Sequence, residues 1–89
     1  MPTVHVPLPL RSLTNQQAKV EVAGETVREL VDSLERRYPG IRDRLCSRDG
    51  HLRPGFAVAI GSRISSDRGL LEQVPANAEV HFLPAVAGG

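Results

Sequence analysis

The sequence predicts a two-layer α+β domain in which a mixed sheet of four to five strands packs on one main helix. Three observations predict this class. Residues 26–38 have the apolar spacing of a single amphipathic helix. Four other segments, 3–8, 18–22, 56–60 and 79–84, alternate in the manner of half-buried strands. The length of 89 residues suits one domain with one modest core.

The helix is the most clearly marked element. Thr26 and Glu29 have the spacing of a capping box at its start, and Pro39-Gly40 ends it. Its apolar stripe consists of Val27, Leu30, Val31, Leu34 and Tyr38. On the outer face Arg28, Asp32 and Arg36 follow each other at four-residue steps, which predicts a ladder of charges on a solvated face.

The first two strands are predicted to form a hairpin joined by a polar loop at 11–17. In the first strand, 3–8, Val4, Val6 and Leu8 share a face, and Pro7 lies near the end or at a bulge. In the second, 18–22, Val20 and Val22 share a face.

The remaining segments are shorter. Residues 41–45 and 70–74 are each expected to form a helical turn, and 63–64 a brief strand. The segment 47–55 is rich in turn residues.

One arrangement that satisfies this order is the β-grasp fold, as in ubiquitin, in which the last strand lies centrally beside the first. The helix covers one face of the sheet and leaves the other open. By the alternation of side chains, the open face carries Thr3, His5, Ala57, Ala59, Glu79, His81 and Leu83. Of these, His5, Ala57, Ala59, His81 and Leu83 form a flat, mildly apolar candidate face for partner docking. Alternatively, the small alanines only suit a short strand.

Composition excludes several classes of function. A net charge of +1 gives no reason to expect a nucleic acid or a membrane surface as partner. The N-terminus lacks the features of a signal peptide, and no window resembles a membrane span. The single cysteine, Cys46, forms no internal disulfide and suits a reducing compartment, so we expect a cytoplasmic protein.

No internal active site emerges from the motifs. The sequence has no phosphate-binding glycine loop, no C-x-x-C pair and no H-E-x-x-H motif. His5 and His81 are expected on adjacent strands, where two solvent-facing histidines are favoured over a metal site. Cys46 has no identifiable base, so a structural or incidental thiol is favoured over a nucleophile. Six arginines between 36 and 53 form either a solvated basic face, which is favoured, or a patch for an acidic partner.

The tail is the distinctive feature. We expect residues 1–84 to form the domain and 85–89 a flexible tail, which in extended form spans about 16–18 Å. Gly88 and Gly89 have no Cβ and suit a narrow channel in another protein. A carboxylate on Gly89 is inert until activated, for example by adenylation, after which it accepts sulfur as a thiocarboxylate or an amine as an isopeptide.

Two stretches carry a family resemblance over essentially the full chain. The ending LPAVAGG (83–89) and the helix with its proline turn, TVRELVDSLERRYPGI (26–41), resemble the MoaD/ThiS family of ubiquitin-like sulfur carriers. The stretches RYPGIRDRL and FLPAVAGG look most like the CysO-type carriers of cysteine biosynthesis.

The resemblance implies a protein that is not itself an enzyme and binds no cofactor. An E1-like enzyme using ATP would adenylate Gly89 and convert it to a thiocarboxylate. The tail threaded into the partner would comprise Leu83, Pro84, Ala85, Val86 and Ala87. For the CysO type, the acceptor is a PLP-dependent cysteine synthase, and a peptidase, which we expect to be metal-dependent, later releases the cysteinyl adduct.

Four alternatives stay open. Two of them involve sulfur transfer: the small subunit of molybdopterin synthase, whose tail enters a large subunit, and a carrier for thiamine or another sulfur-containing product. The other two lie outside sulfur transfer: a ubiquitin-like tag joined to lysines, and a plain binding module. The family resemblance favours sulfur transfer over these last two.

Overall fold

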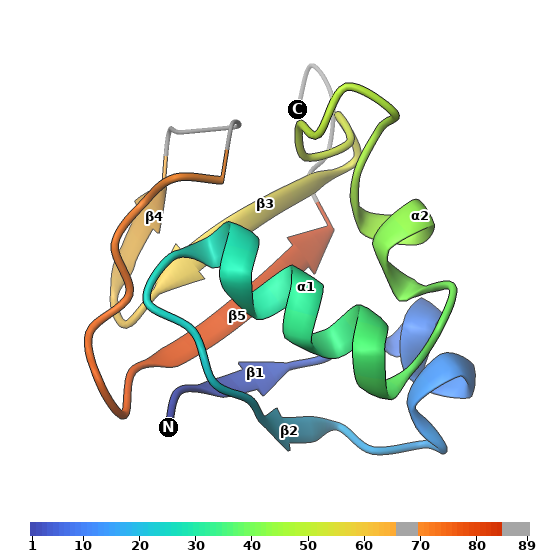
Figure 1. The fold of residues 1–89 in the computed structure, drawn as a ribbon, viewed down its shortest axis with the longest axis horizontal. Helices are drawn as coiled ribbons and strands as arrows, with labels where there is room; N and C mark the ends of the chain where they lie inside the picture. The colour runs from blue at the N-terminus through green and yellow to red at the C-terminus, as the bar shows by residue number, and fades with distance from the viewer. Residues whose placement is uncertain (66–69, 85–89) are drawn as a thin grey trace.

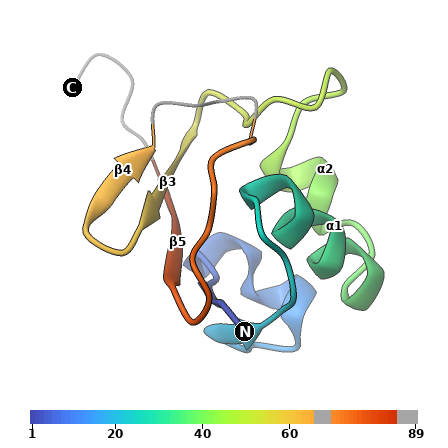
Figure 2. The same cartoon turned by 60° about the vertical axis from the view of Figure 1, so that its left-hand side comes forward.

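A computed structural model describes residues 1–65 and 70–84 of the chain. Along the sequence it contains β1 (Thr3–His5), the 3₁₀ helix η1 (Leu8–Thr14), β2 (Lys19–Glu21), α1 (Val27–Arg37), α2 (Ile41–Leu45), β3 (Phe56–Ile60), β4 (Arg63–Ser65) and β5 (Glu79–Pro84) (Figure 1). The described elements form two layers, with α1 and α2 on one side of the sheet (Figure 2).

The five strands lie in the order β2-β1-β5-β3-β4. The last strand pairs in parallel with β1, Val4 opposite Val80, and antiparallel with β3, Val58 opposite Phe82. The hairpin of β1 and β2 and the central position of the last strand are therefore confirmed, and the sheet is the mixed sheet of a β-grasp fold.

The core lies between α1 and the inner face of the sheet. Its helix residues are the predicted stripe, with Leu30 and Leu34 fully buried, and they meet Val80 and Phe82 of β5. Thr26 caps α1 by accepting a hydrogen bond from the Glu29 amide at 3.2 Å. The predicted helix over 26–38 is thus confirmed, since Thr26 and Tyr38 are its two caps.

The predicted first strand is too long. β1 ends at His5, although the Val6 amide still donates to the Ala18 carbonyl at 2.8 Å, and η1 begins at Leu8. Pro7 and Pro9 offer no N–H to a ladder and favour the first turn of a helix instead. Leu8, expected on the inner face, is consequently 71% exposed, and Leu10 is buried in its place.

The helical turn predicted at 70–74 is wrong. This segment contains no helix, and Gln73 forms an isolated β-bridge with Thr26. Leu70 has a positive φ of 70°, which a right-handed helix does not allow. The carbonyls of Leu70 and Glu72 instead accept hydrogen bonds from the first two amides of α1, so the segment closes the N-terminal end of that helix.

The predicted helical turn at 41–45 is confirmed as α2, and one carboxylate joins it to α1. Gly40, at a positive φ of 103°, reverses the chain between the two helices. The amides of Gly40 and Arg42 both donate to the Glu35 carboxylate, Arg42 at 2.9 Å, and they hold the pKa of Glu35 below its usual range. The start of α2 is therefore fixed against the end of α1.

Candidate docking face and carrier terminus

The strand that leads to the tail lies in the middle of the sheet. β5 is flanked by β1 and β3, and its last two residues, Leu83 and Pro84, pair with Ala57 and Phe56. Leu83 is 38% exposed. The predicted carrier residues Gly88 and Gly89, together with residues 85–87, lie outside the described residues.

The five residues predicted to form the docking face all lie on one face of the sheet. A single cross-strand row contains Lys19, His5, His81, Ala59 and Ile64, from β2 across to β4. Ala57 and Leu83 form a second pair on the same face. The alternation read from the sequence therefore places these five side chains on one face, as predicted, and their role in docking stays a prediction.

Two details of this face differ from the sequence prediction. Ala59, which lies between His81 and Ile64 in the row, is only 7% exposed, so it offers little contact area to a partner. Ile64 is 59% exposed and was not singled out. The signal was present, since a strand at 63–64 paired with β3 puts Ile64 opposite Ala59.

A small polar cluster lies at the centre of the face. The rings of His5 and His81 stack with centroids 3.9 Å apart, and His5 Nε2 lies 2.5 Å from Glu79 Oε1. The contact with His5 lowers the pKa of Glu79. Burial, with a smaller effect of the His5 charge, lowers the pKa of His81. The stack therefore favours a neutral His81.

In residues 1–65 and 70–84, no group of three or more His, Cys, Asp or Glu side chains is arranged to hold a metal ion. Likewise, no helix within those residues is long and apolar enough to cross a membrane.

A shallow hollow of about 480 Å³ adjoins the end of β5. Its lining includes His5, Pro7, Leu8, His81, Leu83 and Pro84. Leu8, displaced outward by the proline-rich start of η1, thus joins Leu83 in an exposed apolar rim beside the docking face. An apolar surface at the root of the tail is suited to contact a protein that receives the tail.

Cys46 lies elsewhere, at the end of α2 in the helix layer. It is 5% exposed, and burial raises the pKa of its thiol. A buried neutral thiol is a poor nucleophile, in agreement with the expectation that Cys46 is structural or incidental.

The mixed five-stranded sheet over one main helix, with its last strand central, defines a ubiquitin-like β-grasp protein. The sequence model of the ThiS family matches residues 4–89, and this chain belongs to that family.

Its relatives agree with this assignment. The chain is 33% identical over 90 residues to the sulfur carrier protein CysO of Mycobacterium tuberculosis, covering 98% of this chain and 97% of the relative. The crystal structure of CysO from M. tuberculosis superimposes with a TM-score of 0.89 at 29% identity, over 97% of this chain and 100% of the other.

Two further structures extend the comparison. The Amycolatopsis orientalis BexX/CysO complex contains a chain that matches with a TM-score of 0.87 at 35% identity, covering 100% of both chains. Small archaeal modifier protein 1 of H. volcanii, at 23% identity and a TM-score of 0.73 over 96% of this chain and 97% of the other, shares the fold.

Proposed function

We propose that this protein is a cytoplasmic sulfur carrier of the CysO type. It carries the sulfur on its Gly89 carboxylate, as a thiocarboxylate, and supplies it for cysteine biosynthesis. The observation that carries the proposal is the match to sulfur carrier protein CysO along 98% of the chain. The family match, which runs to residue 89, supports Gly89 as the reacting residue.

The proposed reaction has two steps. The Gly89 carboxylate attacks the α-phosphorus of ATP in an E1-like enzyme, which releases pyrophosphate and forms an acyl-adenylate. Sulfide then attacks the acyl carbon and displaces AMP, leaving a thiocarboxylate. ATP binds to the activating enzyme, so the carrier itself requires no cofactor.

The carrier with its thiocarboxylate then binds an acceptor enzyme, for which we propose a PLP-dependent cysteine synthase. The thiocarboxylate sulfur forms a bond to the acceptor substrate as the leaving group of that substrate departs, which gives a cysteinyl adduct on Gly89. A metal-dependent peptidase then hydrolyses the bond between Gly89 and the adduct, which releases cysteine and restores the Gly89 carboxylate. The structure of a CysO chain in the BexX/CysO complex supports the idea that carriers of this kind act within protein complexes.

The open face suits the docking step. Leu83 and Ile64 are exposed apolar side chains on either side of a smooth strip formed by Ala57 and Ala59. We propose that partners contact this face while residues 84–89 enter their active sites. Because the strip has few long side chains, little conformational entropy is lost on contact, which suits partners that must bind and release in turn.

Intact-protein mass spectrometry tests the proposal. The full chain is incubated with an E1-like enzyme from the same genome, ATP and sulfide, and we expect a mass gain equal to replacing one oxygen by one sulfur. A variant lacking Gly89 should show no gain, whereas Arg44→Gln, a change on the exposed side of α2, should load normally. Absence of the gain with every E1-like enzyme of that genome would refute the proposal.

A further inference from the structure

The outer side of β2 forms one of the two edges of the sheet (Figure 1). β1 occupies the other side of β2. A hollow of about 470 Å³ borders this edge, and all three residues of β2 line it. The loop residues Asn15 and Gln17 and the end of α1, at Arg37 and Tyr38, complete the lining. The edge of the sheet therefore has open space beside it.

The register of β2 decides which of its backbone groups face this space. The Val6 amide donates to the Ala18 carbonyl at 2.8 Å, so these two residues form a hydrogen-bonded pair across the ladder to β1. Hydrogen-bonded and non-hydrogen-bonded pairs alternate in an antiparallel ladder. The amides and carbonyls of Lys19 and Glu21 are therefore directed away from β1, toward the edge.

One of these four outward groups already has a partner. The Glu21 carbonyl accepts a hydrogen bond from Arg37 Nη1 at 3.0 Å. For the other three, no hydrogen bond is found within residues 1–65 and 70–84. The Arg37 guanidinium also lies over the Tyr38 ring, 5.5 Å from its centroid, so it keeps a contact when it leaves the carbonyl. The edge thus offers two N–H donors and two C=O acceptors to an added strand.

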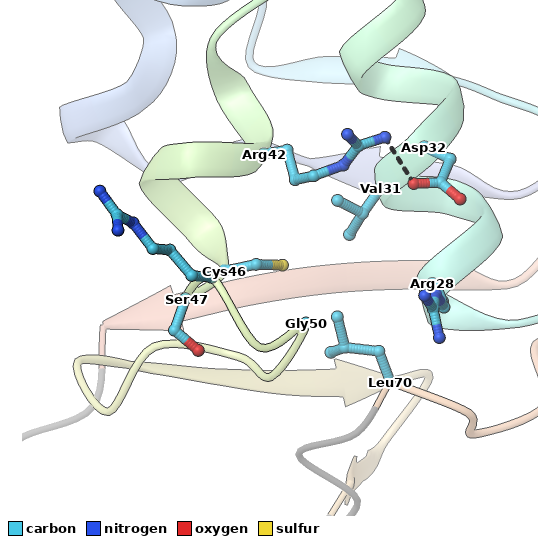
Figure 3. A pocket seen from close by; sticks show the side chains of 9 residues that line it. Arg28, Val31, Asp32, Arg42, Cys46, Ser47, Gly50 and Leu70 are labelled. Atoms are coloured by element: carbon cyan, nitrogen blue, oxygen red, sulfur yellow. Dashed lines mark hydrogen bonds and ion pairs between the residues drawn. The ribbon is translucent and has the colours of Figure 1, made fainter.

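The two outward residues carry opposite charges. The side chains of Lys19 and Glu21 are exposed and, two residues apart on one strand, share a face of the sheet. Elsewhere on the surface opposite charges pair within the chain, as Asp32 of α1 does with Arg42 of α2 at 2.7 Å (Figure 3). In the described part of the chain, neither Lys19 nor Glu21 forms such an ion pair. Both charges are therefore available to a second chain.

We propose that two copies of this chain associate through β2, in an antiparallel pair about a two-fold axis at Val20. In this register Lys19 lies opposite Glu21 of the second copy, and Glu21 lies opposite Lys19 of the second copy. Each of these two pairs exchanges two backbone hydrogen bonds and places opposite charges on directly facing positions. The Glu21 carbonyl then accepts from the amide of the facing Lys19 in place of Arg37.

The charges favour a second copy in this one register. A lysine on an edge strand ordinarily discourages strand pairing. Here, sliding the pair by two residues in either direction would bring Lys19 to face Lys19, or Glu21 to face Glu21, and like charges directly opposite each other are destabilising. In each copy β1 lies between β2 and β5, the strand that leads to the tail. The association is therefore independent of the proposed sulfur transfer.

The test is the oligomeric state of the full chain, measured by sedimentation equilibrium. A pair of three-residue edges buries little surface, so we expect a weak dimer with a Kd of about 0.1–1 mM. Amide hydrogen exchange, followed by nuclear magnetic resonance, locates the contact. Exchange of the Lys19 and Glu21 amides should slow as the protein concentration rises, whereas exchange in β4, at the opposite edge, should not change.

Charge variants test the register. Lys19→Glu and Glu21→Lys should each weaken the dimer about tenfold or more, because each turns two attractive pairs into two repulsive ones. The double variant exchanges the charges within each pair and should restore the Kd to within about threefold. Arg44→Glu, the same change of charge on α2, should leave the Kd within about threefold. All three positions are exposed, and unchanged spectra of the buried Leu30 and Val80 would confirm intact folding.

Three results would overturn the proposal. The first is a chain that stays monomeric at about 1 mM. The second is a dimer that the single charge variants leave unchanged, or that the double variant does not restore. The third is a dimer that Leu83→Glu abolishes and Lys19→Glu does not, which would assign the association to the open face of the sheet.

Discussion

Gly24, in the segment between β2 and α1, is the one described glycine at which an added Cβ would contact other atoms closely. A Cβ added there would lie 2.8 Å from Leu30 Cδ2, 3.0 Å from the Leu30 amide nitrogen and 3.1 Å from the Glu29 carbonyl carbon. Two of these contacts are backbone atoms of α1, and the Leu30 side chain is fully buried, so it has no free space to move into.

The segment around Gly24 cannot easily move away either. The Ser33 hydroxyl donates to the Ala23 carbonyl at 2.7 Å, and the Glu25 amide donates to the Glu29 carboxylate at 3.0 Å. We therefore expect Gly24→Ala to destabilise the domain by about 1–3 kcal/mol, the usual cost of overpacking. For a domain of this size the Tm should fall by about 4–8 °C for each kcal/mol.

Gly55→Ala is the matched control. A Cβ at Gly55 meets no atom within 4 Å, and its φ is not in the left-handed region. This variant should be unchanged or about 0.4–1 kcal/mol more stable, because alanine restricts the unfolded chain. Urea unfolding followed by circular dichroism gives both values. Equal stability of the two variants would refute the close packing of Gly24 against α1.

Three further predictions concern the cap, the histidine stack and the docking face. Thr26→Ala should cost about 0.5–2 kcal/mol in urea unfolding, and Thr26→Ser should restore most of it; no loss would contradict the cap. The pKa of His81 is lowered on folding, so stability should decline as pH falls below about 6.5, and His81→Gln should reduce that decline; an unchanged pH profile would contradict it. Leu83→Glu should lower the kcat/KM of sulfur loading about tenfold at unchanged Tm, whereas Leu71→Glu, beside the start of α1, should not; equal effects would contradict the docking face.

Much of the fold could be predicted because local patterns and tertiary packing agree. The stripe of α1 and the alternation in β3 and β5 each require a partner layer, and one arrangement satisfies them together. The segment 70–74 was misjudged for the opposite reason. Its leucines and Val74 have a helix-like spacing, but its carbonyls are used to complete α1, a long-range role that spacing does not reveal.

The pairing of the charges on α1 could not be predicted for a similar reason. The sequence suggested a ladder of Arg28, Asp32 and Arg36 along the outer face of one helix. In the structure Asp32 pairs instead with Arg42 of α2, and Arg36 donates to Ser33. Which partner Asp32 takes depends on how Gly40 turns the chain between the helices, which is a feature of the tertiary structure.

Fragmentation of the sulfur-loaded protein in a mass spectrometer tests the central claim most directly, because it locates the added sulfur. Two groups of the chain are compared: the Gly89 carboxylate, which takes sulfur by exchange of one oxygen, and the Cys46 thiol, which takes a whole additional sulfur atom from a persulfide donor. Our account assigns the sulfur to the first. We predict that the mass gain resides in the C-terminal fragments that contain Gly89, and that Cys46→Ser loads to the same extent. A gain located at Cys46, or abolished by Cys46→Ser, would contradict the account.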